Sequence, residues 1–307
     1  MKYAISAINE QLRQDPVAFA AAADAAYDEQ INRIADYIRD HAGECPLILL
    51  SGPSGSGKTT SALKLEKTLD AMGLETHTLS MDNYFYTVEG EQAELMAQGK
   101  LDLESPARVD APFLNEQLES IIAGKPTPLP RFDFPTHTRQ DSGITLTRKE
   151  GELVILEGIH ALNPAVITIP ENRTVRLYVS VRTRLETADG AVLHPKKLRL
   201  MRRMLRDTLF RGRQLTDTLK MYESVQRGED AYIMPYKYRS TFDIDTFIPY
   251  EGCLYRRHLL DKLEELADCP DIADLLPALR EMLPMEDEAV PATSLIREFI
   301  GGSVYYE

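Results

Sequence analysis

The sequence feature that most constrains the fold is a glycine-rich turn between an apolar run and a helical pattern. Residues 47–50 read LILL, residues 52–59 read GPSGSGKT, and a helical stretch follows up to Gly73. A short, fully apolar run is typical of a buried parallel strand. A strand, a GxxxxGK[ST] turn and a helix in this order form a phosphate-binding loop. The pattern therefore predicts an α/β fold that binds a nucleoside triphosphate.

Each residue type in the turn has a physical role. Gly55 and Gly57 permit backbone angles that turn successive N–H groups inward around a phosphate, and the next helix directs its positive end at the same anion. Lys58 can reach the β- and γ-phosphates, and the Thr59 hydroxyl can bind Mg²⁺. A chance glycine turn is the alternative, and the flanking strand and helix argue against it. The predicted phosphate-binding residues are Gly52, Ser54, Gly55, Ser56, Gly57, Lys58, Thr59 and Thr60.

Further apolar runs alternate with helical patterns along the chain. They predict buried strands at residues 75–80, 152–158, 175–181 and 243–250. Strands that alternate with helices indicate a mostly parallel sheet flanked by helices. Residues 127–134 and 143–148 look like a pair of strands, with prolines that mark edges or turns.

Composition excludes several classes of partner. The formal net charge of −13 argues against a general binder of nucleic acids or anionic membranes, because such proteins need a broad basic face. The three cysteines are far apart and form no metal-binding spacing, which favours a reducing, cytoplasmic setting. No apolar run reaches the roughly 18 residues of a membrane span. We therefore expect a cytoplasmic protein with no nucleic-acid and no membrane partner.

Two acidic residues end predicted strands, at the edge where doubly wound sheets bind ligands. Asp82 follows the strand 75–80, and Glu157 ends the strand 152–158. Glu157 is placed to help hold the metal, and Asp82 is placed to accept a proton from a hydroxyl that attacks the γ-phosphate. A helix cap or turn is the alternative role of Asp82. Beside a complete phosphate loop we favour the functional interpretation.

A local cluster of cations contrasts with the acidic chain. Eight lysines and arginines but only one acid, Asp207, lie between Lys196 and Arg213. A helix over residues 198–213 would have one apolar face that docks on the protein, formed by Leu198, Met201, Leu205 and Leu209. The opposite face would carry Arg199, Arg203, Arg206 and Arg213, with Arg202 beside them. Guanidinium groups suit phosphate oxygens, so we expect a lid over the triphosphate. A solvated charged face and a nucleic-acid surface are the alternatives.

In this order, the motifs resemble the uridine kinase and phosphoribulokinase family of P-loop kinases, most closely its nucleoside kinase branch. The resemblance runs from about Leu47 to Pro249 and includes GPSGSGKTT, LSMDNYFY, LESP, LPRFDFPTHTR, VILEGIHAL and RRMLRDTLFRGR. It implies an α/β fold with a small β-hairpin substrate region and a helical lid. It also implies transfer of the γ-phosphate of ATP to the 5′-hydroxyl of a ribonucleoside, with Mg²⁺, and uridine or cytidine as the leading acceptors.

The resemblance also assigns residues. The implied catalytic residues are Asp82, which resembles the catalytic base of the family, Lys58 and Arg206. The implied metal ligands are Thr59, Glu157 and Asp82. Arg206 and Arg211 are implied ATP contacts. The implied substrate residues are Glu104, Phe132, His137, Arg203 and Arg213.

Some positions depart from the family pattern. Glu104 stands where the ribose-binding acid is usually Asp, and Phe132 stands where an aromatic with a hydroxyl is usual. Phe85 replaces another usual Tyr, and Met221 replaces a frequent Gln. Since base discrimination depends on hydrogen bonds, these changes leave the preferred base open. His160 in EGIH leans toward phosphoribulokinase, with a packed or capping histidine as the alternative.

We expect three segments: an N-terminal helical segment 1–45, a P-loop kinase domain 46–250 and a C-terminal helical extension 251–307. Asp15 and Pro16 predict a helix start within the first. Two other functions stay open: a kinase for another small alcohol, such as a sugar phosphate or a pantothenate-like acid, and a non-catalytic nucleotide sensor. A homo-oligomer is compatible with the sequence.

Overall fold

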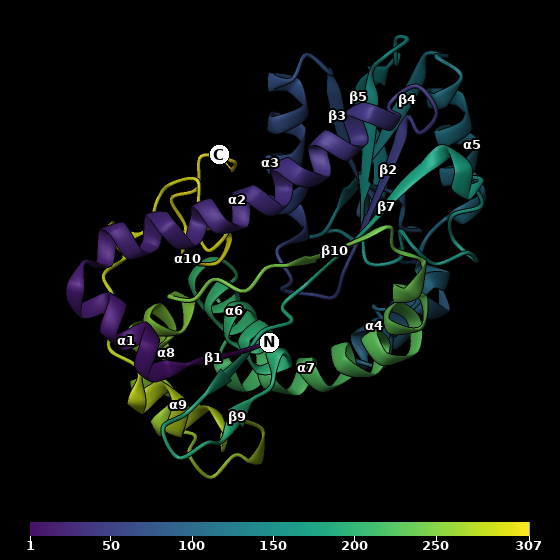
Figure 1. Ribbon diagram of the computed structural model, residues 1–307. Helices are drawn as coiled ribbons and strands as arrows, with labels where there is room; N and C mark the ends of the chain where they lie inside the picture. Colours follow the sequence, from purple (N-terminus) through teal and green to yellow (C-terminus); the bar gives the residue numbers. More distant parts are fainter. Residues whose placement is uncertain (307) are drawn as a thin grey trace.

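The computed structural model describes residues 1–306 and contains a five-stranded parallel sheet, which lies in the upper right of Figure 1. The strand order is β10 (Phe242–Asp245), β7 (Thr174–Ser180), β2 (Leu47–Ser51), β6 (Leu153–Glu157) and β3 (Thr76–Ser80). All neighbours pair in parallel. The predicted α/β fold with a mostly parallel sheet is confirmed. The last strand ends at Asp245 rather than at residue 250, because the Asp245 carboxylate accepts from the Phe247 N–H and turns the chain.

The predicted pair of strands forms an antiparallel hairpin of β4 (Thr127–Asp133) and β5 (Thr138–Leu146). The second strand begins at Thr138 rather than at residue 143, since the connecting turn is short. His137 in this turn has a φ of 54°. A register shift lies between Pro128 and Pro130, where proline cannot donate to the ladder.

Helices flank the sheet and continue beyond it. The longer ones are α1 (Ile5–Gln14), α2 (Pro16–His41), α3 (Lys58–Ala71), α5 (Ala111–Ile122), α6 (Pro195–Phe210), α7 (Leu215–Gly228) and α8 (Glu251–Glu264). The shorter ones are α4 (Glu91–Ala97), α9 (Leu275–Glu281) and α10 (Arg297–Ile300). The Asp15 carboxylate caps α2 through the N–H groups of Val17 and Ala18, as predicted.

The start of the chain contains a strand that the sequence did not predict. β1 (Lys2–Ala4) pairs in parallel with β8 (Arg184–Glu186), and β8 pairs with β9 (Val192–Leu193). A strand this short has no periodicity of its own, so only its distant partner defines it. Glu307, the last residue of the expected C-terminal extension, lies outside the described residues.

Two apolar clusters cover the two faces of the sheet, and α3 and α5 lie on opposite sides of it (Figure 1). Alternate residues of β2 point to opposite clusters: Ile48 and Leu50 to one, Leu47 and Leu49 to the other. The first cluster also contains residues of α1, α2, α8, α9 and the last turns of the chain, such as Ile31, Leu254 and Phe299. Both ends of the chain therefore pack onto the sheet that carries the phosphate loop.

The basic helix differs from its prediction in extent and in the side chains it buries. α6 spans Pro195–Phe210, and Gly212 follows with a φ of 62°, so Arg213 lies beyond the helix. Leu209, expected on the docked face, is 44% exposed. Arg199 and Arg202, expected to face a phosphate, are 2% and 0% exposed. Helical spacing predicts which side chains share a face, but it does not predict which faces other elements cover. Here neighbouring elements cover the face that carries Arg199 and Arg202 as well as the apolar face.

Buried acids from other elements pair with these two arginines. The Arg202 guanidinium donates to both carboxylate oxygens of Glu251, at 2.7 and 3.0 Å. The Tyr255 hydroxyl donates to the same carboxylate at 2.6 Å. Arg199 donates twice to Glu229 at 2.7 Å. These bidentate pairs compensate the cost of removing the charges from water.

No helix within residues 1–306 is both long enough and apolar enough to cross a membrane.

The Arg202–Glu251 pair gives a stability prediction. We expect Glu251→Ala to lower the free energy of unfolding by about 3–5 kcal/mol, because it leaves a buried guanidinium without a counter-charge. Urea denaturation followed by circular dichroism measures the change. Glu223→Ala is the matched control, since its pair with Arg227 is exposed and should contribute less than about 1 kcal/mol. Equal losses in the two variants would contradict the prediction.

Candidate active site

A cavity of about 960 Å³ opens at the carboxyl ends of the parallel strands. It brings together most of the residues that the sequence singled out: Ser54, Gly55, Gly57, Lys58, Thr59, Asp82, Glu104, Phe132, His137, Glu157, Arg203, Arg206, Arg211 and Arg213. Gly52, Ser56 and Thr60 do not line this cavity; they are buried in the turn and in the first turn of α3. Gly52 has no room for a side chain, because a Cβ there would lie 2.1 Å from the Val179 carbonyl oxygen.

The phosphate loop connects β2 to α3. Gly55 and Gly57 adopt φ angles of 71° and 84°, which L-residues with side chains rarely adopt. Neighbours also approach both glycines closely. A Cβ at Gly55 would lie 3.0 Å from the Arg199 carbonyl oxygen, and a Cβ at Gly57 would lie 2.7 Å from Leu295 Cδ1. The loop therefore keeps the anion-binding conformation through its glycines and through packing from α6 and the C-terminal residues.

Three arginines of α6 donate hydrogen bonds to this loop. Arg199 donates to the Ser54 carbonyl at 3.0 Å, and Arg202 donates to the Gly55 carbonyl at 3.3 Å. Arg203 donates to the Ser54 hydroxyl at 3.0 Å. Carbonyls bonded from behind leave the loop N–H groups free to point into the cavity. Two of the arginines expected at the triphosphate thus position the loop instead.

The two strand-end acids share a buried compartment with Lys58. Ser80 donates to Glu157 Oε1 at 2.9 Å. Burial and the charge of Asp82 raise the pKa of Glu157 to about 7, and Lys58 opposes that rise. Burial also raises the pKa of Asp82, again opposed by Lys58. Two neighbouring carboxyl groups with raised pKa values favour binding of a cation, because a cation would stabilise their ionised forms.

Oxygen donors converge in this compartment. The carboxylates of Glu157 and Asp82 and the hydroxyl of Thr59 line the same cavity. Hard oxygen ligands with few protein contacts suit Mg²⁺, which keeps several waters and binds substrate phosphates. These residues therefore fit the implied cofactor.

A single buried acid organises the remaining arginines. Asp207 has no exposure, and its carboxylate lies within 3.0–3.7 Å of Arg203, Arg211 and Arg213. All three arginines also line the cavity. Because one carboxylate neutralises only part of their charge, this side of the cavity remains positive and suits phosphate groups.

Part of the cavity lining is apolar. Phe132 packs edge-on against Phe85 and Phe134, with ring centroids 5.6 and 5.3 Å away. Met221 and His137 also line the cavity. Glu104 lies in the same cavity, where burial raises its pKa and Arg203 opposes the rise. Such a surface can stack a flat ring, while Glu104 can accept hydrogen bonds from hydroxyls.

His160 lies outside this cavity. Its ring is 1% exposed and packs edge-on against Tyr232 at 6.4 Å. Burial lowers the pKa of His160 to about 4, so the ring is neutral at pH 7. His160 is therefore a packed histidine, the alternative given in the sequence analysis, and it does not contact the ligand cavity.

Sequence reasoning missed two charged residues of the cavity. Arg108 is 5% exposed, and its guanidinium lies 5.6 Å from the centroid of the Phe85 ring. Glu298 comes from the last turns of the chain; its carboxylate accepts from the Thr60 hydroxyl at 2.7 Å and lies 3.7 Å from Arg206. No local spacing connects Glu298 to the phosphate loop, so the sequence carries no signal for this contact.

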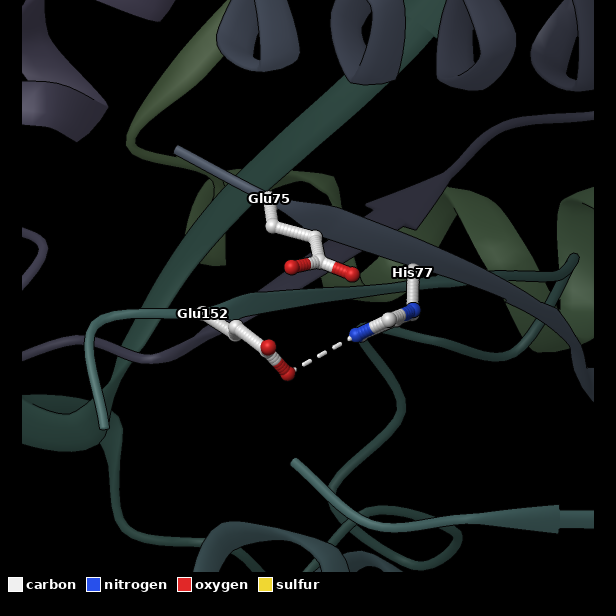
Figure 2. A group of neighbouring side chains, drawn as sticks. All are labelled: Glu75, His77 and Glu152. Atoms are coloured by element: carbon white, nitrogen blue, oxygen red, sulfur yellow. Dashed lines mark hydrogen bonds and ion pairs between the residues drawn. The ribbon is translucent and has the colours of Figure 1, made fainter. Parts of the chain in front are cut away.

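A second acidic cluster lies at the opposite edge of the sheet. Glu75, His77 and Glu152 converge where β3 and β6 begin (Figure 2), and His77 Nε2 lies 3.0 Å from Glu152. Lys149 Nζ lies 3.2 Å from Glu152 and 3.9 Å from Glu75. Lys149 already supplies a cation, and the pKa of Glu152 is lowered to about 2 by hydrogen bonds from Lys149 and His77. The cluster is separate from the phosphate loop.

Comparison with known proteins agrees with this geometry. Residues 47–247 match the model of the phosphoribulokinase/uridine kinase family. Uridine kinases of Staphylococcus aureus strains JH9 and Newman are each 33% identical over 195 residues, which cover 62% of this chain and 83% of theirs.

Solved structures resemble the chain more distantly. A structure described as a possible uridine kinase from Bacillus stearothermophilus is 17% identical, covers 69% of this chain and 97% of its own, and has a TM-score of 0.43. The YGR205w protein is 18% identical, covers 68% and 86%, and has a TM-score of 0.48. Both scores are below 0.5, so the fold assignment depends on the strand order and on the family match. The chain belongs to the phosphoribulokinase/uridine kinase family of kinases, which transfer a phosphoryl group to an alcohol.

Proposed function

We propose that this protein is an ATP-dependent nucleoside kinase that phosphorylates the 5′-hydroxyl of a ribonucleoside, with uridine and cytidine as the leading acceptors. The observation that carries the proposal is one cavity lined by Lys58 and Thr59 of the phosphate loop and α3, by Asp82, and by Glu104 and Phe132. A triphosphate and a hydroxyl-bearing ring would meet at Asp82. The proposal includes a cytoplasmic protein without a nucleic-acid or membrane partner.

The reaction assigns one step to each group. The acceptor oxygen attacks the γ-phosphorus, the bond to the β,γ-bridging oxygen breaks, and ADP leaves. Asp82 accepts the proton of the hydroxyl, and burial raises its pKa, which makes its carboxylate a stronger base. Lys58 and Arg206 stabilise charge on the transferred group, with Arg211 on the donor phosphates. Mg²⁺ held by Thr59, Glu157 and Asp82 would supply further neutralisation of phosphate charge.

At the acceptor end, Glu104 would hold the ribose hydroxyls and Phe132 would stack against the base. His137, Arg203 and Arg213 would complete the contacts. The surface here offers few hydrogen-bond groups for the edge of a base, because Phe85 and Met221 replace polar residues of the family pattern. We therefore expect modest discrimination between bases.

A kinase for an anionic alcohol is the second candidate. Arg108, Arg203 and Arg213 all line the cavity that holds Glu104, and such cations would suit a sugar phosphate or a carboxylate. The apolar ring surface around Phe132 favours the nucleoside. A non-catalytic sensor is the third possibility, and it requires ATP binding without turnover.

An acceptor panel tests the proposal. We expect ADP release from Mg·ATP to depend on a ribonucleoside, with turnover of uridine and cytidine within about tenfold of each other, given the few polar contacts. Sugar phosphates and pantothenate are included as acceptors. Turnover of one of these without nucleoside activity would establish the second candidate, and ATP binding without any turnover would establish the sensor.

The role of Asp82 gives a second prediction. Asp82→Asn removes the proton acceptor, so we expect turnover to fall by about 10²–10⁴-fold, with ATP affinity changed by less than about threefold. Steady-state kinetics and calorimetric ATP titration measure the two quantities. Asp217→Asn, an exposed change on α7, is the matched control. A parallel loss of ATP binding and turnover would count against the base role.

The raised pKa of Glu157 gives a third prediction. In an unfolded chain its carboxyl ionises near pH 4.5, but in the folded protein it keeps its proton up to about pH 7. Metal-free protein should therefore lose stability as pH rises from 5 to 8, by up to about 3 kcal/mol. Glu157→Gln should match wild type at pH 5 and exceed it at pH 8. Urea unfolding in EDTA measures this, with the exposed Glu223→Gln as control. An unchanged pH slope in Glu157→Gln would contradict it.

A further inference from the structure

The last turns of the chain lie outside the family match but belong to the folded core. Leu295 and Phe299 have no exposure. The Ser294 hydroxyl donates to Asp24 of α2 at 2.8 Å, and the last part of the chain lies beside α2 (Figure 1). The segment of residues 294–306, which we name the C-terminal segment, is thus a fixed part of the structure.

One acid of the C-terminal segment enters the ligand cavity. Glu298 lines the cavity that also contains Lys58 and Asp82, and its side chain is only 10% exposed. Glu298 Oε2 accepts a hydrogen bond from the Thr60 hydroxyl at 2.7 Å, and the Tyr306 hydroxyl approaches the same oxygen at 3.4 Å. Two hydroxyl groups therefore fix the direction of this carboxylate.

The other carboxylate oxygen of Glu298 faces Arg206. Glu298 Oε1 lies 3.7 Å from Arg206 Nη1, and no other carboxylate of residues 1–306 lies within 4 Å of this guanidinium. The Phe299 ring centroid lies 6.0 Å from the central carbon of the same guanidinium. The C-terminal segment thus supplies both the counter-charge and a packing surface for Arg206.

Arg206 is held differently from its neighbours. Asp207 of the same helix pairs with three other arginines of the cavity lining, whereas Arg206 depends on a carboxylate from the end of the chain. Arg206 and Glu298 also line a second cavity, of about 670 Å³, between the C-terminal segment and the end of α6. Arg206 Nε is buried and has no hydrogen-bond partner among residues 1–306, so the side chain keeps a donor for an incoming phosphate.

We propose that Glu298 is a positioning residue, which holds the Arg206 guanidinium at the cavity so that it contacts the γ-phosphate of the donor. The inference rests on the proposed function in taking Arg206 as a contact of the transferred phosphoryl group. It assigns a role in the reaction to a residue outside the matched family region.

Two opposite effects of the Glu298 charge follow from its position. Fixing a long arginine side chain costs conformational entropy when a ligand binds, and a carboxylate that already holds the guanidinium removes part of this cost. The same negative charge also repels the phosphates. If positioning is the stronger effect, loss of the charge weakens the γ-phosphate contact. If repulsion is stronger, loss of the charge strengthens it.

A comparison of ATP with ADP separates the two effects, because only ATP carries a γ-phosphate. Calorimetry on the full chain with Mg·ATP and Mg·ADP gives the ratio of the ADP to the ATP dissociation constant. Glu298→Gln keeps an acceptor for the Thr60 hydroxyl but removes the charge that faces Arg206. We expect this variant to lower the ratio by about three- to tenfold. An unchanged or raised ratio would overturn the inference.

A double-mutant cycle shows whether Glu298 acts through Arg206. Arg206→Ala should lower the ratio by about tenfold or more, as expected for loss of a charge-assisted hydrogen bond. Adding Glu298→Gln to Arg206→Ala should change the ratio by less than about twofold. A further fall as large as that in the single variant would show that Glu298 acts independently, and an unchanged ratio in Arg206→Ala would also refute the proposal.

Glu288→Gln is the matched control, because Glu288 is exposed and lines neither cavity. It should leave both affinities unchanged. Glu298→Asp keeps the charge and should lose less of the ratio than Glu298→Gln, whereas an equal loss would contradict a role of the charge. Circular dichroism melting checks that each variant folds. The binding ratio requires no acceptor, so failure of the acceptor panel would overturn the proposed function alone.

Discussion

The guanidinium of Arg202 has no solvent exposure and lies where α6, α8 and the phosphate loop meet. It binds the Glu251 carboxylate and also donates to the Gly55 carbonyl, so one side chain joins the core to the anion-binding turn. Arg199 repeats this arrangement with Glu229 and the Ser54 carbonyl. A loop that must expose its N–H groups needs its carbonyls held elsewhere. Much of the cationic helix therefore shapes the phosphate loop instead of contacting phosphate.

The charges that line the cavity form two groups. Asp207 gathers Arg203, Arg211 and Arg213 in one group, and Glu157 and Asp82 influence each other beside Lys58 in the second. The first group attracts phosphate, and the second attracts a divalent cation. An acidic chain can bind a polyanion in this way, because the positive field is confined to a cavity with low-dielectric walls.

Several parts of the site could be predicted because their signals are local. The phosphate loop is a continuous motif between a strand and a helix, and parallel strands bring their carboxyl ends to one edge, so Asp82 and Glu157 had to lie near it. The assignment of Arg199 and Arg202 to a phosphate face was wrong, because helical spacing does not show which partner a face meets. Glu229 and Glu251, their partners, are 30 and 49 residues away. Glu298 is 238 residues from Thr60.

The sequence by itself determined the parallel α/β sheet, the phosphate loop and the acids at the strand ends, because these depend on short-range periodicity and on the geometry of parallel strands. Only the tertiary structure decided which arginines are buried, that the C-terminal segment joins the phosphate loop, and that a second cavity lies beside α6. These features depend on contacts between residues far apart in the chain, such as Leu295 on Gly57 and Phe210 near Gly301. Such contacts leave no pattern in the sequence, since burial and packing are properties of the assembled fold.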